Sequence, residues 1–234
     1  ARNRHRSERT VGLYTTPKHS RMINLTNEDN MELMKRYPDN YFELAIVDPP
    51  YGILNEKTII TKTHKNGTKT TNKNHKSILW DSIPCEEYFK ELKRISSNQI
   101  IFGANYFLQF LDVSSGWICW DKLVSNDVHF ASVEFLYSSF TSSSKIIKIS
   151  PFDNLRGGKD RIHPTQKPVK LYEWLLMNYA KEGDKILDTH LGSGSIAIAC
   201  HNLGFDLVGC ELDTEYYEAA CKRLKRHQAQ LTMF

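Results

Sequence analysis

The sequence predicts an α/β fold in which helices cover a central, mostly parallel sheet. Short apolar runs alternate with amphipathic segments along the chain, as in proteins built from strand–helix–strand units. Residues 44–47 are apolar without interruption, which is typical of a parallel strand buried on both faces. A glycine turn at 192–194 separates a strand pattern from an alanine-rich helix pattern, and this order is typical of a nucleotide-type pocket.

Strands are expected where short runs of apolar and β-branched residues end at turn residues. The run 44–47 leads into two prolines, and the run 99–102 ends at Gly103. In chain order the expected strands are 22–25, 44–47, 99–102, 117–120, 133–137, 185–187 and 207–210.

Helices are expected where apolar residues recur three and four positions apart. Asn27 is the expected cap of the first helix, and Pro168 suits the first turn of a later one because its φ is already helical. In chain order the expected helices are 27–36, 86–95, 106–111, 168–179, 195–203 and 214–227. Segments 53–79, 138–145 and 151–161 are expected to be loops.

Composition places the chain among ordinary soluble proteins. With 234 residues, 40% hydrophobic and 25% charged, it predicts one domain at 22–234 preceded by a basic arm at 1–21. No apolar run approaches the roughly 18 residues that span a bilayer, and the N-terminal segment lacks the apolar stretch of a secretory signal. Five scattered cysteines without a paired spacing indicate a reduced, intracellular protein and no zinc site.

Positive charge is concentrated in two segments, although the net charge is only +4. The arm at 1–21 holds four arginines within its first ten residues, and segment 57–79 holds six lysines and no acid. Clustered cations separated by amides and hydroxyls suit a phosphate backbone, but they also suit a solvated loop that binds nothing. The candidate DNA-binding residues are Lys62, Lys65, Lys69, Lys73 and Lys76.

The turn Asp48-Pro49-Pro50-Tyr51, here called the amine turn, follows the apolar strand 44–47 directly. Two prolines lack N–H groups and fix φ, so the strand ends in a stiff turn with free carbonyls. A carboxylate and a carbonyl accept N–H bonds, and a tyrosine ring stacks on flat molecules. The turn therefore suits a flat ring that bears an exocyclic amine, whereas the simpler interpretation is an ordinary strand-to-loop turn.

A second candidate site, here called the glycine turn, spans residues 188–194. Gly192 and Gly194 allow close approach of the backbone to a ligand, and Glu211, 17 residues past Gly194, ends the next strand, where it suits ribose hydroxyls. Asp188 at the mouth of the turn opposes a pyrophosphate and favours a ligand with a cationic amino-acid end. The glycine pattern alone would fit a dinucleotide equally well.

In this order the two turns resemble those of the DNA amino-methyltransferases that use S-adenosylmethionine, in their β arrangement. The resemblance runs from about residue 22 to 224. It includes Asp29, 19 residues before Asp48, the segment His163-Pro164-Thr165-Gln166-Lys167-Pro168, and the strings at 120–122 and 132–137. It implies a Rossmann-like methyltransferase fold with a twisted sheet of about seven strands, one of them antiparallel, and helices on both faces.

The resemblance implies methyl transfer from S-adenosylmethionine directly to N6 of a flipped adenine in double-stranded DNA, without a metal. Asp48 and the carbonyl of Pro49 would accept the amine, and Tyr51 would stack on the base. Asp29 would contact the cofactor's adenine, and Lys167 its carboxylate. The candidate cofactor-binding residues are Asp29, His163, Thr165, Lys167, Asp188, Leu191, Gly192, Ser193, Gly194 and Glu211. Similar enzymes form homodimers and occur in the cytoplasm of bacterial or phage-infected cells.

The chain departs from the family pattern in two places. Residues 188–190 read Asp-Thr-His where the family usually has Asp-Pro-Phe, so His190 is expected to be neutral if it lines the pocket. The segment 138–162, where the family carries its target-recognition region, is short. Alternative functions are transfer to N4 of cytosine, an NAD-dependent oxidoreductase, a DNA-binding protein without catalysis, or the same reaction on RNA.

Overall fold

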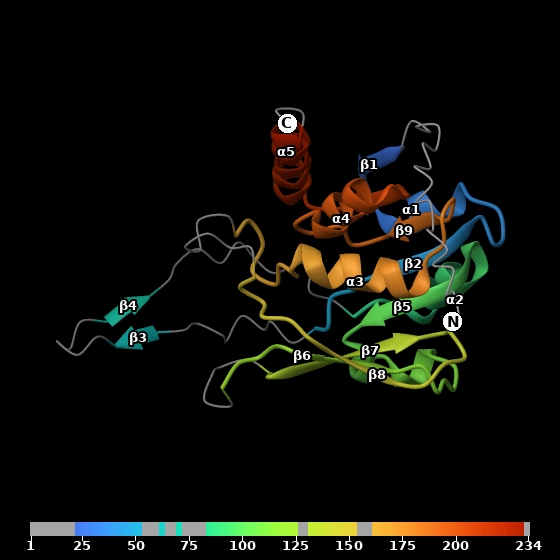
Figure 1. The fold of residues 1–234 in the computed structure, drawn as a ribbon, viewed down its shortest axis with the longest axis horizontal. Helices are drawn as coiled ribbons and strands as arrows, with labels where there is room; N and C mark the ends of the chain where they lie inside the picture. Colours follow the sequence, from blue (N-terminus) through green and yellow to red (C-terminus); the bar gives the residue numbers. More distant parts are fainter. Residues whose placement is uncertain are drawn as a thin grey trace, which may run out of the picture.

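The computed structural model describes residues 22–52, 83–125, 131–153 and 161–231, together with the backbone of β3 (Thr61–Thr63) and β4 (Lys69–Thr71). Within this part, eight strands form one sheet in the order β1–β10–β9–β2–β5–β7–β6–β8 (Figure 1). The strands are β1 Ile23–Asn27, β2 Phe42–Val47, β5 Ser96–Phe102, β6 Ile118–Asp121, β7 Val133–Ser138, β8 Lys145–Lys148, β9 Lys185–Asp188 and β10 Asp206–Glu211.

The sheet is parallel except for one strand. β7 runs antiparallel to both of its neighbours, β5 and β6, and every other pairing in this sheet is parallel. The expected mostly parallel sheet with one antiparallel strand is confirmed, and the sheet has eight strands instead of about seven.

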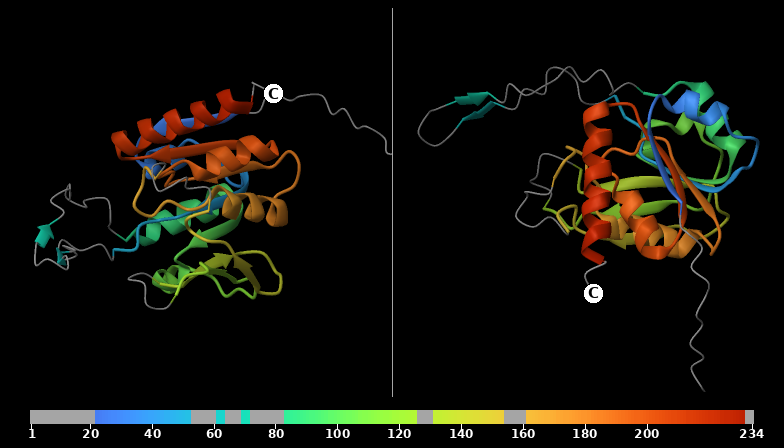
Figure 2. Two further views of the ribbon diagram at one scale, coloured as in Figure 1. Left: turned by 60° about the vertical axis from the view of Figure 1, so that its left-hand side comes forward. Right: turned by 90° about the horizontal axis from the view of Figure 1, so that it is seen from above.

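Helices lie on both faces of the sheet (Figure 2). The helices α3 (Val169–Tyr179), α4 (Ser195–Leu203) and α5 (Thr214–Leu231) pack on one face, and α1 (Asn30–Lys35) and α2 (Glu86–Ile95) pack on the other. In β2, Leu44 and Ile46 belong to the first core, and Ala45 and Val47 belong to the second. Burial on both faces therefore explains why this strand is apolar without interruption.

The first helix begins two residues later than expected, and the prediction that Asn27 caps it is wrong. Asp29 is the cap, because its Oδ1 accepts N–H bonds from Met31 and Glu32 at 2.8 and 3.4 Å. Asn27 instead ends β1, where its amide donates to the Glu211 carbonyl at 2.8 Å. Asn27 therefore joins the end of β1 to the end of β10. Pro168, similarly, is the N-cap of α3 and precedes its first turn.

Three segments expected to be irregular or helical have a different structure. Residues 145–148 form β8, which pairs with β6 and leaves Ile146 exposed while Ile147 is buried. This strand also removes 145–148 from the segment 138–162 that was expected to read the target. Two single 3₁₀ turns, η1 (Ala104–Tyr106) and η2 (Leu108–Phe110), replace the helix expected at 106–111. Within the expected loop 53–79, β3 and β4 form an antiparallel pair apart from the main sheet (Figure 1).

Three further expectations concern the N-terminal arm, membrane-spanning helices and the cysteines. The arm at 1–21 lies outside the described residues. In the part of the chain that is described, no helix is both long and apolar enough to cross a membrane. All five cysteines are free, and Cys200 and Cys210 are buried in the two cores.

Candidate active site

The amine turn and the glycine turn lie side by side at one edge of the sheet. β2 and β9 are adjacent parallel strands, Asp48 follows β2 directly, and Asp188 is the last residue of β9. The chain continues from β2 through α2 to β5 and from β9 through α4 to β10, so the two connections cover opposite faces. Such a switch point, outside the carboxyl ends of the strands, is where open α/β sheets bind ligands.

The carboxylate of Asp48 is held by two side chains in this structure. Its Oδ1 accepts the Tyr51 hydroxyl at 2.5 Å, and its Oδ2 lies 2.5 Å from the Lys167 ammonium group. Lys167 also lies 3.3 Å from Glu134 of β7, whose other oxygen is 2.9 Å from Lys122. The amine turn is therefore the end of a chain of four charged groups, in which two carboxylates alternate with two ammonium groups.

Burial and mutual attraction decide the charges in this group. Burial raises the pKa of Asp48, and the nearby charge of Glu134 adds to this effect, while Lys167 opposes it. Burial alone would raise the pKa of Glu134, but the facing ammonium groups of Lys167 and Lys122 lower it overall. The two carboxylates in turn hold the pKa of Lys167 above its usual value although burial opposes this. Glu134 and Lys167 are thus charged at neutral pH, and of the two carboxylates Asp48 is the one whose pKa is raised.

Tyr51 is seated against Gly103, the residue that follows β5. A Cβ placed on Gly103, whose φ is +61°, would lie 2.2 Å from Cε1 of the tyrosine ring. The ring of Tyr51 stacks on that of Tyr106 with centroids 5.0 Å apart and an angle of 14° between the planes. Glycine is therefore required here for the ring as well as for the backbone. Tyr106 is 40% exposed, so this aromatic pair reaches the surface.

The glycine turn is held mainly by backbone N–H groups. Glu211 Oε2 accepts the N–H of Gly192 at 2.8 Å, and its Oε1 accepts the N–H of Asp213 at 3.0 Å. Leu191 donates its N–H to the carbonyl of Cys210, and α4 begins directly after Gly194, whose φ is +68°. Gly192 has a φ of +50°, and the nearest side chain to a Cβ there would be His163 at 3.9 Å. The backbone at Gly192 is therefore not covered closely by side chains, and it lies next to the carboxylate of Glu211.

Asp188 is a buried acid whose Oδ1 accepts the N–H of His190 at 2.9 Å. Burial raises the pKa of Asp188 to about 8, and the charges of Asp48 and Glu211 contribute to this rise. A ligand that brings a positive charge to Asp188 would favour the ionised form. A pyrophosphate would instead be disfavoured, because Asp188 and Glu211 are both acids.

His190 is neutral, as expected. Its Nε2 accepts from the Asn30 amide at 3.0 Å, and its Nδ1 lies 3.0 Å from the Thr189 hydroxyl. Burial lowers the pKa of His190 to about 3. Its ring packs edge-on against that of Tyr88, with the ring centroids 5.3 Å apart, so His190 packs toward α1 and α2.

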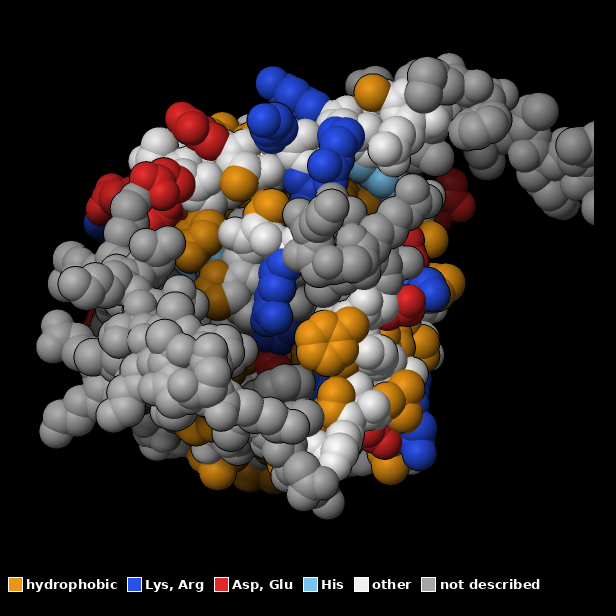
Figure 3. Space-filling model, turned by 90° about the vertical axis from the view of Figure 1, so that its left-hand side faces the viewer, with side chains coloured by type: hydrophobic (Ala, Val, Ile, Leu, Met, Phe, Trp, Pro, Cys, Tyr) orange, Lys and Arg blue, Asp and Glu red, His pale blue; other side chains and the backbone are white. Residues whose placement is uncertain are grey.

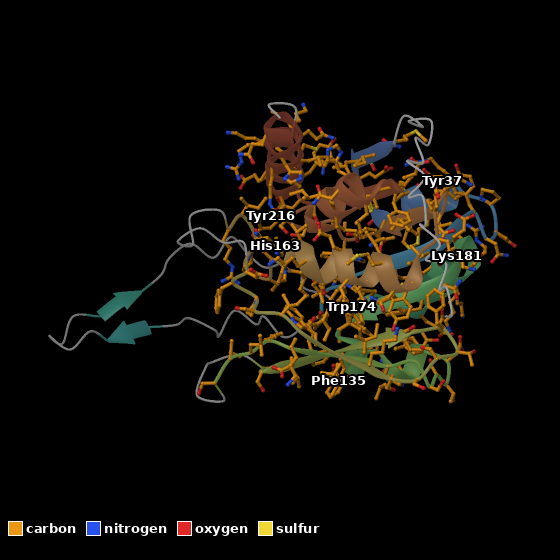
Figure 4. All side chains as sticks on the ribbon, viewed as in Figure 1. Tyr37, Phe135, His163, Trp174, Lys181 and Tyr216 are labelled. Atoms are coloured by element: carbon orange, nitrogen blue, oxygen red, sulfur yellow. The ribbon has the colours of Figure 1, made fainter. Side chains whose placement is uncertain are left out.

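The segment 163–168 joins the two turns. Its Lys167 contributes the ammonium group at Asp48, while the carbonyl of Lys167 accepts the hydroxyl of Ser195 at 2.7 Å. His163 lies over Gly192 and contacts Tyr216 of α5, with ring centroids 4.4 Å apart (Figure 4). Thr165 is exposed and donates its N–H to His163 Nδ1 at 3.3 Å, and burial, with the charges of Lys167 and Arg161, lowers the pKa of His163 to about 4.

Lys167 is placed differently from the prediction, and the predicted DNA-binding lysines lie partly or wholly outside the described structure. Lys167, expected at the cofactor's carboxylate, faces the amine turn, because Asp48 and Glu134 attract its ammonium group. Of the predicted DNA-binding lysines, Lys62 and Lys69 lie on β3 and β4, of which only the backbone is described. Lys65, Lys73 and Lys76 lie outside the described residues. Asp29 is brought close to this edge by its place after β1, where it caps α1.

Figure 3 views the molecule from the side at which the parallel strands end. Lys and Arg side chains gather along the top of this face, where α5 lies. That helix carries four basic residues within five positions, Lys222, Arg223, Lys225 and Arg226. Arg223 also donates to the Ser193 carbonyl at 2.8 Å, so this basic segment adjoins the glycine turn. Among the described residues, no group of three or more His, Cys, Asp and Glu side chains is placed to hold a metal ion.

Sequence reasoning did not include Glu134 and Gly103 among the site residues. Glu134 was taken only as support for the fold, although an acid in an otherwise apolar strand pattern at 133–137 was a signal. Gly103 was taken only as the end of a strand. Both residues reach the amine turn through strands that are distant in the sequence.

Comparison with known proteins agrees with this arrangement. A family model described as DNA methylase matches residues 117–222. The chain is 25% identical to the Type II methyltransferase M.HpaI of Haemophilus parainfluenzae over 83% of this chain and 71% of that protein. It is 28% identical to M.HinfI of Haemophilus influenzae over 84% and 67%.

Solved structures show the same fold. The M1.HpyAVI–SAM complex superposes with a TM-score of 0.58 at 22% identity, covering 87% of this chain and 100% of that one. The cytosine-N4-specific PvuII DNA methyltransferase superposes with a TM-score of 0.60 at 13% identity, covering 89% and 92%. At these identities the structures establish the Rossmann-like methyltransferase fold alone, and the sequence matches support the assignment of the chain as a DNA methyltransferase that uses S-adenosylmethionine.

Proposed function

We propose that this enzyme transfers the methyl group of S-adenosylmethionine to N6 of adenine in double-stranded DNA. The observation that carries the proposal is the placement of the amine turn and the glycine turn at the ends of adjacent strands, joined by Lys167. One turn offers a carboxylate to an amine, and the other offers an open backbone and acids to a cofactor with hydroxyl and ammonium groups.

The residues of the glycine turn fit S-adenosylmethionine. Gly192 leaves the backbone open, Glu211 lies where ribose hydroxyls need an acceptor, and Asp188 is a buried acid that an ammonium group would keep ionised. Asp29, His163, Thr165, Leu191, Ser193 and Gly194 complete the proposed binding residues. When bound, this cofactor supplies an electrophilic methyl group on a sulfonium. The same acids disfavour the pyrophosphate of NAD.

The amine turn acts on the nucleophile. In the proposed reaction, Asp48 and the Pro49 carbonyl accept hydrogen bonds from the two N–H groups of the N6 amine. These hydrogen bonds favour a pyramidal nitrogen. As the new N–C bond forms and the C–S bond breaks, positive charge grows on that nitrogen, and the carboxylate of Asp48 stabilises it. The methylated nitrogen then gives one proton to the carboxylate of Asp48, which passes it to solvent. Tyr51, with Tyr106 stacked beside it, provides the aromatic surface for the flipped base.

DNA would approach the edge shown in Figure 3. The basic residues of α5 and the lysines at 62–76 would contact phosphates without reading bases. Of the segment expected to recognise the target, the described residues 139–144, 149–153 and 161–162 lie outside the sheet. A homodimer and a cytoplasmic location remain predictions.

The experiment is methylation of a DNA library with labelled S-adenosylmethionine, followed by digestion to nucleosides. We expect the label in N6-methyldeoxyadenosine. Label in N4-methyldeoxycytidine would support the second candidate, which the same carboxylate–amine chemistry serves. Absence of label from DNA, with label in RNA or in neither, would contradict the proposal.

A further inference from the structure

The strongest unassigned feature is the buried acid Glu134, which contacts the amine turn from the antiparallel strand β7. Its side chain is 11% exposed, and those of Asp48, Lys167 and Lys122 are 16%, 7% and 13% exposed. Its Oε1 lies 2.9 Å from the Tyr51 hydroxyl and 3.3 Å from Lys167 Nζ, and its Oε2 lies 2.9 Å from Lys122 Nζ. Both groups that hold Asp48 are therefore also within reach of Glu134.

The observed arrangement is not ready for the proposed reaction. Both oxygens of Asp48 are engaged, one by the Tyr51 hydroxyl and the other by the Lys167 ammonium group. Each of these oxygens can accept a second hydrogen bond, but an incoming amine must share Asp48 with both donors. An ammonium group 2.5 Å from the carboxylate also opposes the positive charge that grows on the amine.

The two groups cannot simply leave Asp48 without another acceptor. Lys167 is buried, and an unpaired ammonium group in such a place is strongly unfavourable. The Tyr51 hydroxyl has one proton, which it can donate to Asp48 or to Glu134 but not to both at once. Glu134 is the described carboxylate within reach of both groups besides Asp48, and Lys122 holds its other oxygen in place.

We propose that Glu134 is a positioning residue that takes the Tyr51 hydroxyl and the Lys167 ammonium group when the target amine occupies Asp48. The exchange breaks one hydrogen bond and one ion pair at Asp48 and strengthens the corresponding contacts at Glu134, with no net movement of charge out of the site. The inference rests on the proposed function and adds to it a residue from a distant strand.

The test compares Glu134→Gln with the parent in single-turnover methylation. Glutamine keeps the shape and an acceptor oxygen but removes the charge. We expect the methylation rate to fall roughly 10- to 100-fold, the size of a lost charge-assisted hydrogen bond, while S-adenosylhomocysteine affinity stays within about 2-fold. Glu134→Asp, which keeps the charge, should recover part of the rate. Glu86→Gln, at an exposed ion pair with Lys90, is the matched control and should equal the parent.

Two further readouts separate this role from a merely structural one. Asp48 is faced by Lys167, Tyr51 and Glu134, and Asp188 lies nearby; removing the charge of Glu134 lowers the pKa of Asp48. The acid limb of the rate profile should therefore move to lower pH in Glu134→Gln. In a Lys167→Met background, where the ammonium group shared by Asp48 and Glu134 is gone, Glu134→Gln should reduce the rate less than about 3-fold.

The outcomes distinguish this inference from the proposed function. A parent that methylates DNA, with Glu134→Gln equally fast and its acid limb unmoved, would overturn the inference alone. Equal losses from Glu134→Gln with and without Lys167 would also overturn it. A parent that transfers no methyl group to DNA would overturn the proposed function and this inference with it. If Glu134→Gln does not fold, the Glu134→Asp and Lys122→Met variants decide, and parental rates in both would contradict it.

Discussion

The two turns at the edge of the sheet are built in different ways. The glycine turn is held by its own strand β9 and by the next strand along the chain, β10, mostly through backbone N–H groups that Asp188, Glu211 and the Cys210 carbonyl accept. The amine turn is held by side chains from β5, β7 and segment 163–168, through Gly103, Glu134 and Lys167. One site is thus determined locally and the other by the assembled sheet, so substitutions should affect them differently.

The largest expected effect is on methyl transfer. Asp48→Ala should reduce the single-turnover rate by at least about 10³-fold, because no carboxylate remains to stabilise the charge on the amine. Its S-adenosylhomocysteine affinity should change less than about 3-fold, since the glycine turn is held independently. The matched variant Glu211→Ala should instead bind S-adenosylhomocysteine roughly 10- to 100-fold more weakly. Similar losses of affinity in both variants would contradict the separation of the two turns.

The next effect is a pH dependence of cofactor affinity. The pKa of Asp188 is about 8 without a ligand, and an ammonium group favours its ionised form, so binding releases a proton below that pH. Affinity for S-adenosylhomocysteine, measured by calorimetry, should therefore weaken as pH falls from 8 to 6, by at most about 10-fold per pH unit.

Asp188→Asn is the control for this dependence, and it should bind weakly at every pH. The same raised pKa predicts the sign of a stability change. Asp188 is protonated in the folded protein between its unfolded pKa and about pH 8, so its contribution to stability is present at low pH and is lost as pH rises through 8. Asp188→Asn should accordingly melt higher than the parent at pH 9. An affinity that is flat from pH 6 to 8 in the parent would show that Asp188 does not face the ammonium group.

The last effect concerns the stability contributed by Gly103, on which the ring of Tyr51 is seated. Gly103→Ala should lower the free energy of unfolding by about 2–4 kcal/mol, because the new Cβ meets the tyrosine ring at 2.2 Å and φ is positive. Gly183→Ala is the matched control, since its φ is +90° but nothing lies within 4 Å of a Cβ there, and it should lose only about 1 kcal/mol. Urea unfolding measures both. Equal losses would mean that Tyr51 is not seated on Gly103.

This difference also explains what the sequence could predict. The glycine turn, its preceding strand and the helix Ser195–Leu203 were located because each pattern is contiguous. Asp48 and Tyr51 were identified because two prolines mark the turn. Their partner Glu134 and the direction of Lys167 could not be read, because both depend on which strand lies next to β5. β8 was not predicted for the same reason, because its four residues become a strand only through pairing with β6.

The most direct test of the central claim, that both turns form one site, is the affinity of a bisubstrate analogue. Such a molecule would join the N6 atom of adenine, through a short linker, to the position of the sulfur in S-adenosylhomocysteine. If the turns share one site, the parent should bind it at least about 10-fold more tightly than S-adenosylhomocysteine, and Asp48→Ala should lose that gain while binding S-adenosylhomocysteine normally. No gain in affinity for the parent, or an equal gain in Asp48→Ala, would contradict the account.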